Sequence, residues 1–81
     1  MSELSRLRWL CRRGMKELDV VMTGYLENYY SGATESDQQS FKTLLEMQDP
    51  DLFALLVGRS ESGDQNITEM VRFLKGMTGR Q

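Results

Sequence analysis

The chain changes character across one short stretch, which reads Arg12-Arg13-Gly14-Met15-Lys16-Glu17-Leu18-Asp19. The chain before it is basic, because residues 1–16 carry five basic groups against one acid. The chain after it is acidic, because residues 17–64 carry ten acids against two basic groups. A helical pattern of apolar residues also stops at Arg13, and a longer one starts at Met15. These changes predict a junction between two helices at Gly14.

A helix is predicted before the junction, over residues 3–12. Ser2 can cap its first turn, where Glu3 suits the positive end of the helix dipole. Gly14 is expected to end the helix, since glycine takes a positive φ at no steric cost. Trp9 lies off the apolar stripe, among basic residues. The stripe itself is formed by Leu4, Leu7, Leu10 and Cys11.

A longer helix is predicted after the junction, over residues 15–30. Glu17 falls in its first turn, where free backbone N–H groups favour a carboxylate. Val20 and Val21 are expected to widen the apolar face. Gly24 costs about 1 kcal/mol relative to alanine unless a neighbour packs closely on it. The apolar face repeats at helical spacing through Met15, Leu18, Met22, Tyr25, Leu26 and Tyr29.

Three further helices are predicted, over residues 35–47, 50–57 and 66–75. Thr34 opens the first of them in a variant of the capping box with Asp37. Asp49 and Pro50 open the second, as its N-cap and its first helical residue. Gly58 ends that helix.

The sequence as a whole predicts an all-α fold. No segment shows sustained period-two alternation, so no strand is expected. Residues 76–81 are expected to fray. A chain of 81 residues forms one domain at most. Short helices with short connections therefore predict a small five-helix bundle, a single domain over residues 1–81.

The composition argues against catalysis and metal binding. The chain has no histidine and a single cysteine, Cys11. It therefore lacks His-based acid–base and nucleophilic chemistry, and it cannot form an intrachain disulfide. The acids fit no EF-hand spacing, so no metal site is predicted. Cys11 lies on an apolar stripe and is expected to be buried rather than reactive.

Hydropathy indicates a protein outside the membrane. No apolar run approaches the roughly 20 residues that span a bilayer. The first residues lack the apolar segment of a signal peptide, and Glu3 does not suit a transit peptide. We therefore expect a cytoplasmic protein without membrane insertion, and a monomer.

The motif Arg13-Gly14-x-x-Glu17 has two interpretations. In the structural one, Gly14 breaks a helix, Glu17 caps the next, and Arg13 pairs with Glu17 or with the preceding carbonyls. In the functional one, Arg13 and Glu17 project from the junction as a compact docking patch for another protein. The residues alone leave both open.

The basic N-terminal segment with Trp9 allows a nucleic-acid-binding hypothesis, because arginine and an aromatic ring can grip a backbone and stack on a base. The acidic remainder of the chain and a pI near 5.0 are wrong for that class. A solvated helix face or a protein partner is the better interpretation, and no nucleic-acid partner is expected.

Two runs of sequence carry a family resemblance. The first is Trp9-x-Cys11-Arg12-Arg13-Gly14-Met15-Lys16-Glu17-Leu18-Asp19, and the second is Phe41-x-x-Leu44-Leu45-Glu46 followed by Asp49-Pro50-Asp51-Leu52-Phe53. In this order and spacing they resemble the SdhE family, small helical factors for the flavinylation of succinate dehydrogenase. The resemblance covers most of the chain.

The resemblance implies a five-helix protein that is not an enzyme. Such factors bind the flavoprotein subunit of succinate dehydrogenase, and in bacteria also that of fumarate reductase. They promote covalent attachment of FAD to a histidine of that subunit, so the FAD is handled on the client protein and no cofactor is expected to bind tightly here. The alternative is a regulatory, antitoxin-like module that acts on a different protein client.

The resemblance also implies which residues contact the client. Arg13, Gly14 and Glu17 match the surface motif of the family. The flanking candidates for partner binding are Arg6, Trp9, Met15 and Asp19.

Overall fold

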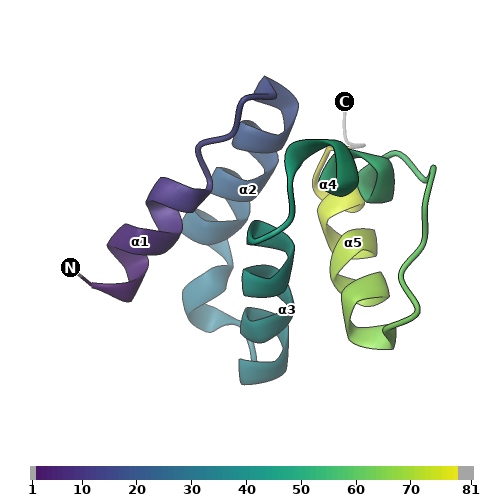
Figure 1. Ribbon diagram of the computed structural model, residues 1–81. Helices are drawn as coiled ribbons and strands as arrows, with labels where there is room; N and C mark the ends of the chain where they lie inside the picture. The colour runs from purple at the N-terminus through teal and green to yellow at the C-terminus, as the bar shows by residue number, and fades with distance from the viewer. Residues whose placement is uncertain (1, 79–81) are drawn as a thin grey trace.

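The computed structural model describes residues 2–78, which contain five α-helices, one short 3-10 helix and no strand (Figure 1). The all-α prediction is confirmed. The elements are α1 (Glu3–Leu10), α2 (Lys16–Asn28), η1 (Tyr30–Gly32), α3 (Glu35–Leu45), α4 (Asp49–Leu56) and α5 (Gln65–Thr78).

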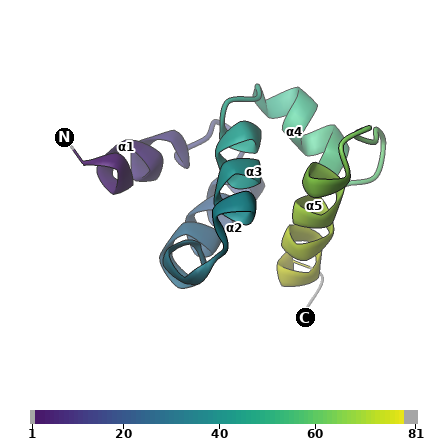
Figure 2. The ribbon, with the colours of Figure 1, turned by 90° about the horizontal axis from the view of Figure 1, so that it is seen from below.

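Three helices form the centre of the molecule. α3 packs against α5, and α2 also packs against α5. α1 lies against α2 and α3 on the side away from α5, as the two views of Figures 1 and 2 agree. α4 follows α3 directly and packs against α5 and α2. The α1–α2 connection therefore meets the α3–α4 connection.

The core collects most of the predicted apolar stripes, but Leu4 and Tyr29 were placed on these stripes wrongly, because 44% and 45% of their surfaces are exposed. Its fully buried side chains are Cys11, Leu18, Met22, Phe41, Leu44, Leu45, Leu52 and Leu74. Complete burial of such an aliphatic side chain contributes about 1.5–3 kcal/mol. Cys11 is buried as predicted, and this burial raises the pKa of its thiol to about 11. The group is therefore a thiol rather than a thiolate at neutral pH.

Local capping signals set several helix ends as predicted. The Thr34 hydroxyl accepts a hydrogen bond from the Asp37 N–H at 3.1 Å. Gly58 has a φ of +85° and ends α4. There the Arg59 N–H donates to the Ala54 carbonyl and the Gly58 N–H to the Leu55 carbonyl, which is a Schellman motif.

Two boundary predictions near the junction are wrong. α1 ends at Leu10, and Gly14 does not take a positive φ. Gln48, not Asp49, is the N-cap of α4, and Asp49 is its first helical residue. The Asp49 side chain is used elsewhere, as described below.

The remaining differences lie on α2 and α5. Val20 does not widen the buried face, because 62% of its surface is exposed. α2 ends at Asn28, and Tyr30 starts the separate turn η1. Residues 76–78 do not fray but continue α5, whereas residues 79–81 lie outside the described chain.

Gly24 was expected to weaken α2 unless a neighbour packs closely on it, and Met77 does so. A Cβ at this position would lie 3.4 Å from the Met77 methyl carbon. The glycine therefore lets α5 approach α2, and this contact holds the last turn of α5 in place. That turn was predicted to fray because it contains Gly76 and lies at the end of the chain.

Alanine at Gly58 and at Gly76 should shift the free energy of unfolding in opposite directions. Gly58→Ala should destabilise by at least about 1 kcal/mol, because its positive φ is strained for a side chain. Gly76→Ala should stabilise by about 0.5 kcal/mol, because it is helical and an added Cβ meets nothing within 4 Å. Urea unfolding followed by circular dichroism measures both, and a destabilising Gly76→Ala would contradict the continued helix.

Candidate functional site

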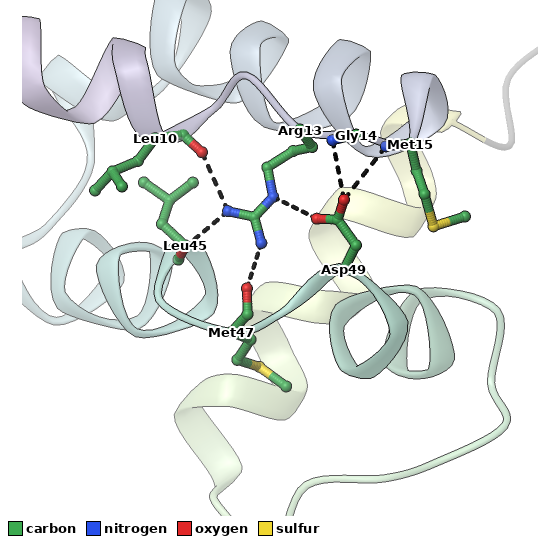
Figure 3. A network of polar contacts seen from close by, with 7 residues as sticks. All are labelled: Leu10, Arg13, Gly14, Met15, Leu45, Met47 and Asp49. Atoms are coloured by element: carbon green, nitrogen blue, oxygen red, sulfur yellow. Dashed lines mark hydrogen bonds and ion pairs between the residues drawn. The ribbon is translucent and has the colours of Figure 1, made fainter.

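Arg13 points into the molecule, into the space between the two helix connections (Figure 3). Its Nε donates to Asp49 Oδ1 at 2.8 Å. Its Nη1 donates to the Leu10 carbonyl at 3.1 Å and to the Leu45 carbonyl at 2.8 Å, and its Nη2 donates to the Met47 carbonyl. Only 8% of the side-chain surface remains exposed.

The positions of these acceptors explain why a guanidinium suits the site. Leu10 is the last residue of α1, and Leu45 is the last residue of α3. Carbonyls at a helix C-terminus have no partner within the helix and carry the negative end of its dipole. Arg13 therefore satisfies two helix ends at once and brings a positive charge to both.

Asp49 accepts hydrogen bonds at the N-terminus of α2 and lies at the N-terminus of α4. Its Oδ2 accepts from the Gly14 N–H at 3.0 Å and from the Met15 N–H at 3.3 Å. Met15 is the N-cap of α2 and makes no side-chain cap of its own. Asp49 itself lies in the first turn of α4, so its negative charge faces the positive ends of two helices.

Gly14 is needed here for close approach rather than for backbone conformation. A Cβ at this position would lie 3.3 Å from Asp49 Oδ2, a distance at which the carboxylate must shift by a few tenths of an ångström. The glycine lets the carboxylate reach two consecutive backbone N–H groups.

The surroundings of Asp49 shift its acidity. Partial removal from water acts to raise its pKa, but the hydrogen bonds from Arg13 and from the Met15 and Gly14 backbones outweigh this effect. The pKa of Asp49 is therefore held below its ordinary value of 3.8. The carboxylate is ionised at neutral pH and pairs with the guanidinium.

The structural interpretation correctly expected Arg13 to form contacts within the protein, but it named one wrong partner. Arg13 does bond a preceding carbonyl, that of Leu10, but its ion pair is with Asp49 and not with Glu17. It does not project from the junction. Sequence reasoning took Asp49 for a cap of its own helix, although the run Asp49-Pro50-Asp51-Leu52-Phe53 already accompanied the junction in the family resemblance.

Glu17 is the residue of the motif that faces outward. It is the second residue of α2 and is exposed. Between residues 2 and 78 nothing forms a hydrogen bond or ion pair with its carboxylate. It borders an open groove between α2 and the end of α5, lined by Lys16, Glu17, Val20, Val21, Gly24 and Met77.

The flanking candidates are not gathered into one cluster. Arg6 and Trp9 are exposed on α1, Trp9 with 69% of its surface. Met15 is half-buried and packs against the core. Asp19 is half-buried on α2 and accepts a hydrogen bond from the Thr23 hydroxyl at 3.3 Å. Whether each contacts a partner stays a prediction.

The described part of the chain holds neither a group of candidate metal ligands nor a membrane-spanning helix. Within it, no three acids or cysteines come together as a metal site would require. None of its helices has the length and apolar character needed to cross a membrane. What the site presents is a free carboxylate on a firmly held helix terminus, next to an apolar groove.

Comparison with known proteins shows the family of this chain. The family model described as "Flavinator of succinate dehydrogenase" matches residues 5–78. The chain belongs to this flavinator family. Among the curated relatives, the FAD assembly factor SdhE of Vibrio cholerae is 45% identical over 67 residues, which is 83% of this chain and 78% of the relative.

Two further relatives match more of the chain. The FAD assembly factor SdhE of Idiomarina loihiensis is 39% identical over 74 residues, 91% of this chain and 82% of the relative. That of Shewanella oneidensis is 38% identical over 76 residues, 94% and 93% of the two chains. The family match over residues 5–78 includes both connections that Arg13 and Asp49 join.

Replacement of Arg13 should destabilise this flavinator-family fold. Arg13→Ala removes the donor of Asp49 Oδ1 and of three carbonyls, and we expect a loss of about 3 kcal/mol. Arg13→Lys keeps the charge but not the planar fork, and we expect a loss of about 2 kcal/mol. Arg12→Ala is the matched control, because Arg12 is exposed and should change stability by less than about 0.5 kcal/mol. Urea unfolding measures all three, and equal stability of the Arg12 and Arg13 variants would refute the role of the pair.

The low pKa of Asp49 also predicts a pH dependence of stability. Because its folded-state pKa is depressed, its contribution is complete above the unfolded value of 3.8 and is lost as pH falls through the folded-state pKa. The wild-type protein should therefore lose more stability than Asp49→Asn between pH 5 and pH 2. Thermal unfolding at a series of pH values tests this, and parallel curves for the two proteins would contradict it.

Proposed function

We propose that the protein is a non-enzymatic assembly factor that binds the flavoprotein subunit of succinate dehydrogenase, and that of fumarate reductase, and promotes covalent attachment of FAD to it. Membership of the flavinator family supports this role. The observation that carries it is the free carboxylate of Glu17, held on a helix terminus that the Arg13–Asp49 pair fixes in place.

The motif residues have different tasks in this proposal. Arg13 and Gly14 are committed to internal contacts, so they shape the docking surface from beneath. Glu17 is left free to accept a hydrogen bond or an ion pair from the client. Its neighbours in the groove, Val20 and Met77, supply apolar area beside that polar contact.

The factor acts by differential binding. Without histidine, the chain supplies no histidine acceptor for the flavin, so the reacting groups belong to the client. The FAD remains on the client and is not held tightly by this protein. By binding one client conformation better than others, the factor raises the population in which FAD and its acceptor are aligned.

The test is covalent flavin on the flavoprotein subunit, read as fluorescence in a denaturing gel after co-expression. The wild-type factor should raise the signal over a strain without it, and Glu17→Gln should reduce that gain about tenfold, the size of effect expected from about 1.4 kcal/mol of lost binding. Glu61→Gln, an exposed acid in the loop after α4, is the matched control and should behave as wild type.

Two outcomes would overturn the proposal. Equal fluorescence with and without the wild-type factor would remove the assembly role. A pull-down that recovers a different protein and no flavoprotein subunit would favour the regulatory, antitoxin-like alternative. Circular dichroism of Glu17→Gln separates a lost contact from a lost fold.

A further inference from the structure

A second hollow lies where the end of α2, the turn η1, the first turn of α3 and the first half of α5 meet. We name it the aromatic hollow and define it by Tyr25, Tyr29, Asp37, Glu69 and Phe73. Its volume is about 340 Å³, near the lower end of the range for sites of small ligands. It shares no lining residue with the groove between α2 and the end of α5. It is therefore a separate candidate site.

Three aromatic rings meet in the aromatic hollow. The rings of Tyr25 and Tyr29 stack with their centroids 5.8 Å apart. The Phe73 ring stands nearly perpendicular to both, with its centroid 5.7 Å from that of Tyr25 and 5.0 Å from that of Tyr29. Tyr29 and Phe73 keep 45% and 44% of their surfaces exposed. The face of an aromatic ring carries the negative part of its quadrupole, so exposed rings attract a cation.

The charged side chains of the aromatic hollow are both acids. Asp37 and Glu69 line it, and no basic residue does. Neither acid forms an ion pair with any residue from 2 to 78, and Glu69 accepts a hydrogen bond only from the Gln65 amide, at 3.0 Å. The last turn of α2, which ends at the hollow, also holds no basic residue. The negative end of the α2 dipole therefore adds to the two carboxylates.

A role in starting α3 leaves the Asp37 carboxylate free to bind a cation. Asp37 lies in the first turn of α3, where the helix dipole favours an acid. Its backbone N–H donates to the Thr34 hydroxyl, but within the described chain no side chain donates to its carboxylate. The position in the helix thus explains why an acid is tolerated there, and not why the acid lacks a partner.

Tyr25 supplies a hydroxyl group to the aromatic hollow. Only 2% of its surface is exposed, and no residue from 2 to 78 forms a hydrogen bond with its hydroxyl. Among the buried and half-buried residues of the described chain, every polar side-chain atom that is sealed from solvent has a partner. The Tyr25 hydroxyl therefore keeps an opening to solvent, and the hollow that Tyr25 lines is that opening. Burial, and after it the charge of Asp37, raises the pKa of Tyr25, so the hydroxyl is neutral and its oxygen can accept a hydrogen bond.

We propose that the aromatic hollow binds an arginine side chain of a partner protein. The guanidinium lies against the exposed rings of Tyr29 and Phe73, and its N–H groups donate to the two carboxylates and to the Tyr25 hydroxyl. A guanidinium is planar, stacks on aromatic rings and carries five N–H donors, whereas the lysine ammonium is compact and carries three. Three acceptors beside exposed rings therefore favour arginine over lysine.

The arginine belongs to a different protein rather than to a second copy of this chain. The formal net charge of the chain is −2, so two copies repel each other as they approach. A partner with a positively charged surface is attracted to the two acids of the hollow. This inference goes beyond the proposed function and does not rest on it.

The test is a titration of the isotope-labelled full-length protein with the peptide acetyl-Gly-Arg-Gly-amide, followed by NMR at constant ionic strength. The neutral control replaces arginine by citrulline, whose urea group has nearly the same shape but no charge. The arginine peptide should bind at least about tenfold more tightly than the citrulline peptide, because the neutral group loses the cation–π contact and the charge-assisted hydrogen bonds. A lysine peptide should bind about threefold more weakly than the arginine peptide. The backbone signals of Tyr29, Asp37 and Phe73 should shift, whereas that of the exposed Trp9 on α1 should not.

Three variants test the hollow itself. Glu69→Gln should weaken binding of the arginine peptide about fivefold, because it removes one of the two negative charges. Tyr29→Leu should weaken it about threefold, because it removes an exposed ring. Glu61→Gln is the matched control, since Glu61 is an exposed acid in the loop after α4 and lies outside the hollow, and it should bind as wild type. Circular dichroism must show that each variant is folded as the wild type is.

The outcomes decide the inference without the flavoprotein subunit. Equal binding of the arginine and citrulline peptides, or equal weakening by Glu69→Gln and Glu61→Gln, would overturn it. A lysine peptide that binds as tightly as the arginine peptide would overturn the assignment to a guanidinium. A wild-type dimer that Glu69→Gln separates into monomers would make the occupant a second copy, which also contradicts the inference. The proposed function is tested by covalent flavin on the client, so each can fail while the other stands.

Discussion

The ion pair between Arg13 and Asp49 is the interaction on which the arrangement of this protein depends. It places a positive charge at the C-termini of α1 and α3 and a negative charge at the N-termini of α2 and α4. Each charge therefore meets the helix ends of opposite sign, and backbone groups that have no partner within their helices are satisfied. One pair of side chains holds four helix ends together.

This constraint divides the short motif between internal contacts and an exposed carboxylate. Arg13 and Gly14 are used internally, so the start of α2 is fixed relative to α3 and α4. Glu17 follows one turn later on the same helix and points to solvent. The position of its carboxylate is therefore set by contacts inside the molecule.

Much of the fold was predictable from local patterns. The apolar repeats located all five helices, and Thr34 and Gly58 act through contacts within four or five residues in sequence. The errors occurred where one face of a helix meets a distant element. Val20 is apolar yet exposed, because α5 covers only part of that side of α2. The last turn of α5 is helical because Met77 packs on Gly24, a contact that its own sequence does not encode.

The sequence by itself determined the helices, the caps at Thr34 and Gly58, the absence of histidine chemistry and the family to which the junction motif points. Only the tertiary structure decided which side chains of that motif face inward. Arg13 and Asp49 are 36 residues apart, and Asp49 could equally have capped its own helix. The sequence near Asp49 does not distinguish a carboxylate that caps its own helix from one that pairs with Arg13. The choice is made by packing, which brings the α1–α2 and α3–α4 connections together and leaves Glu17 outside.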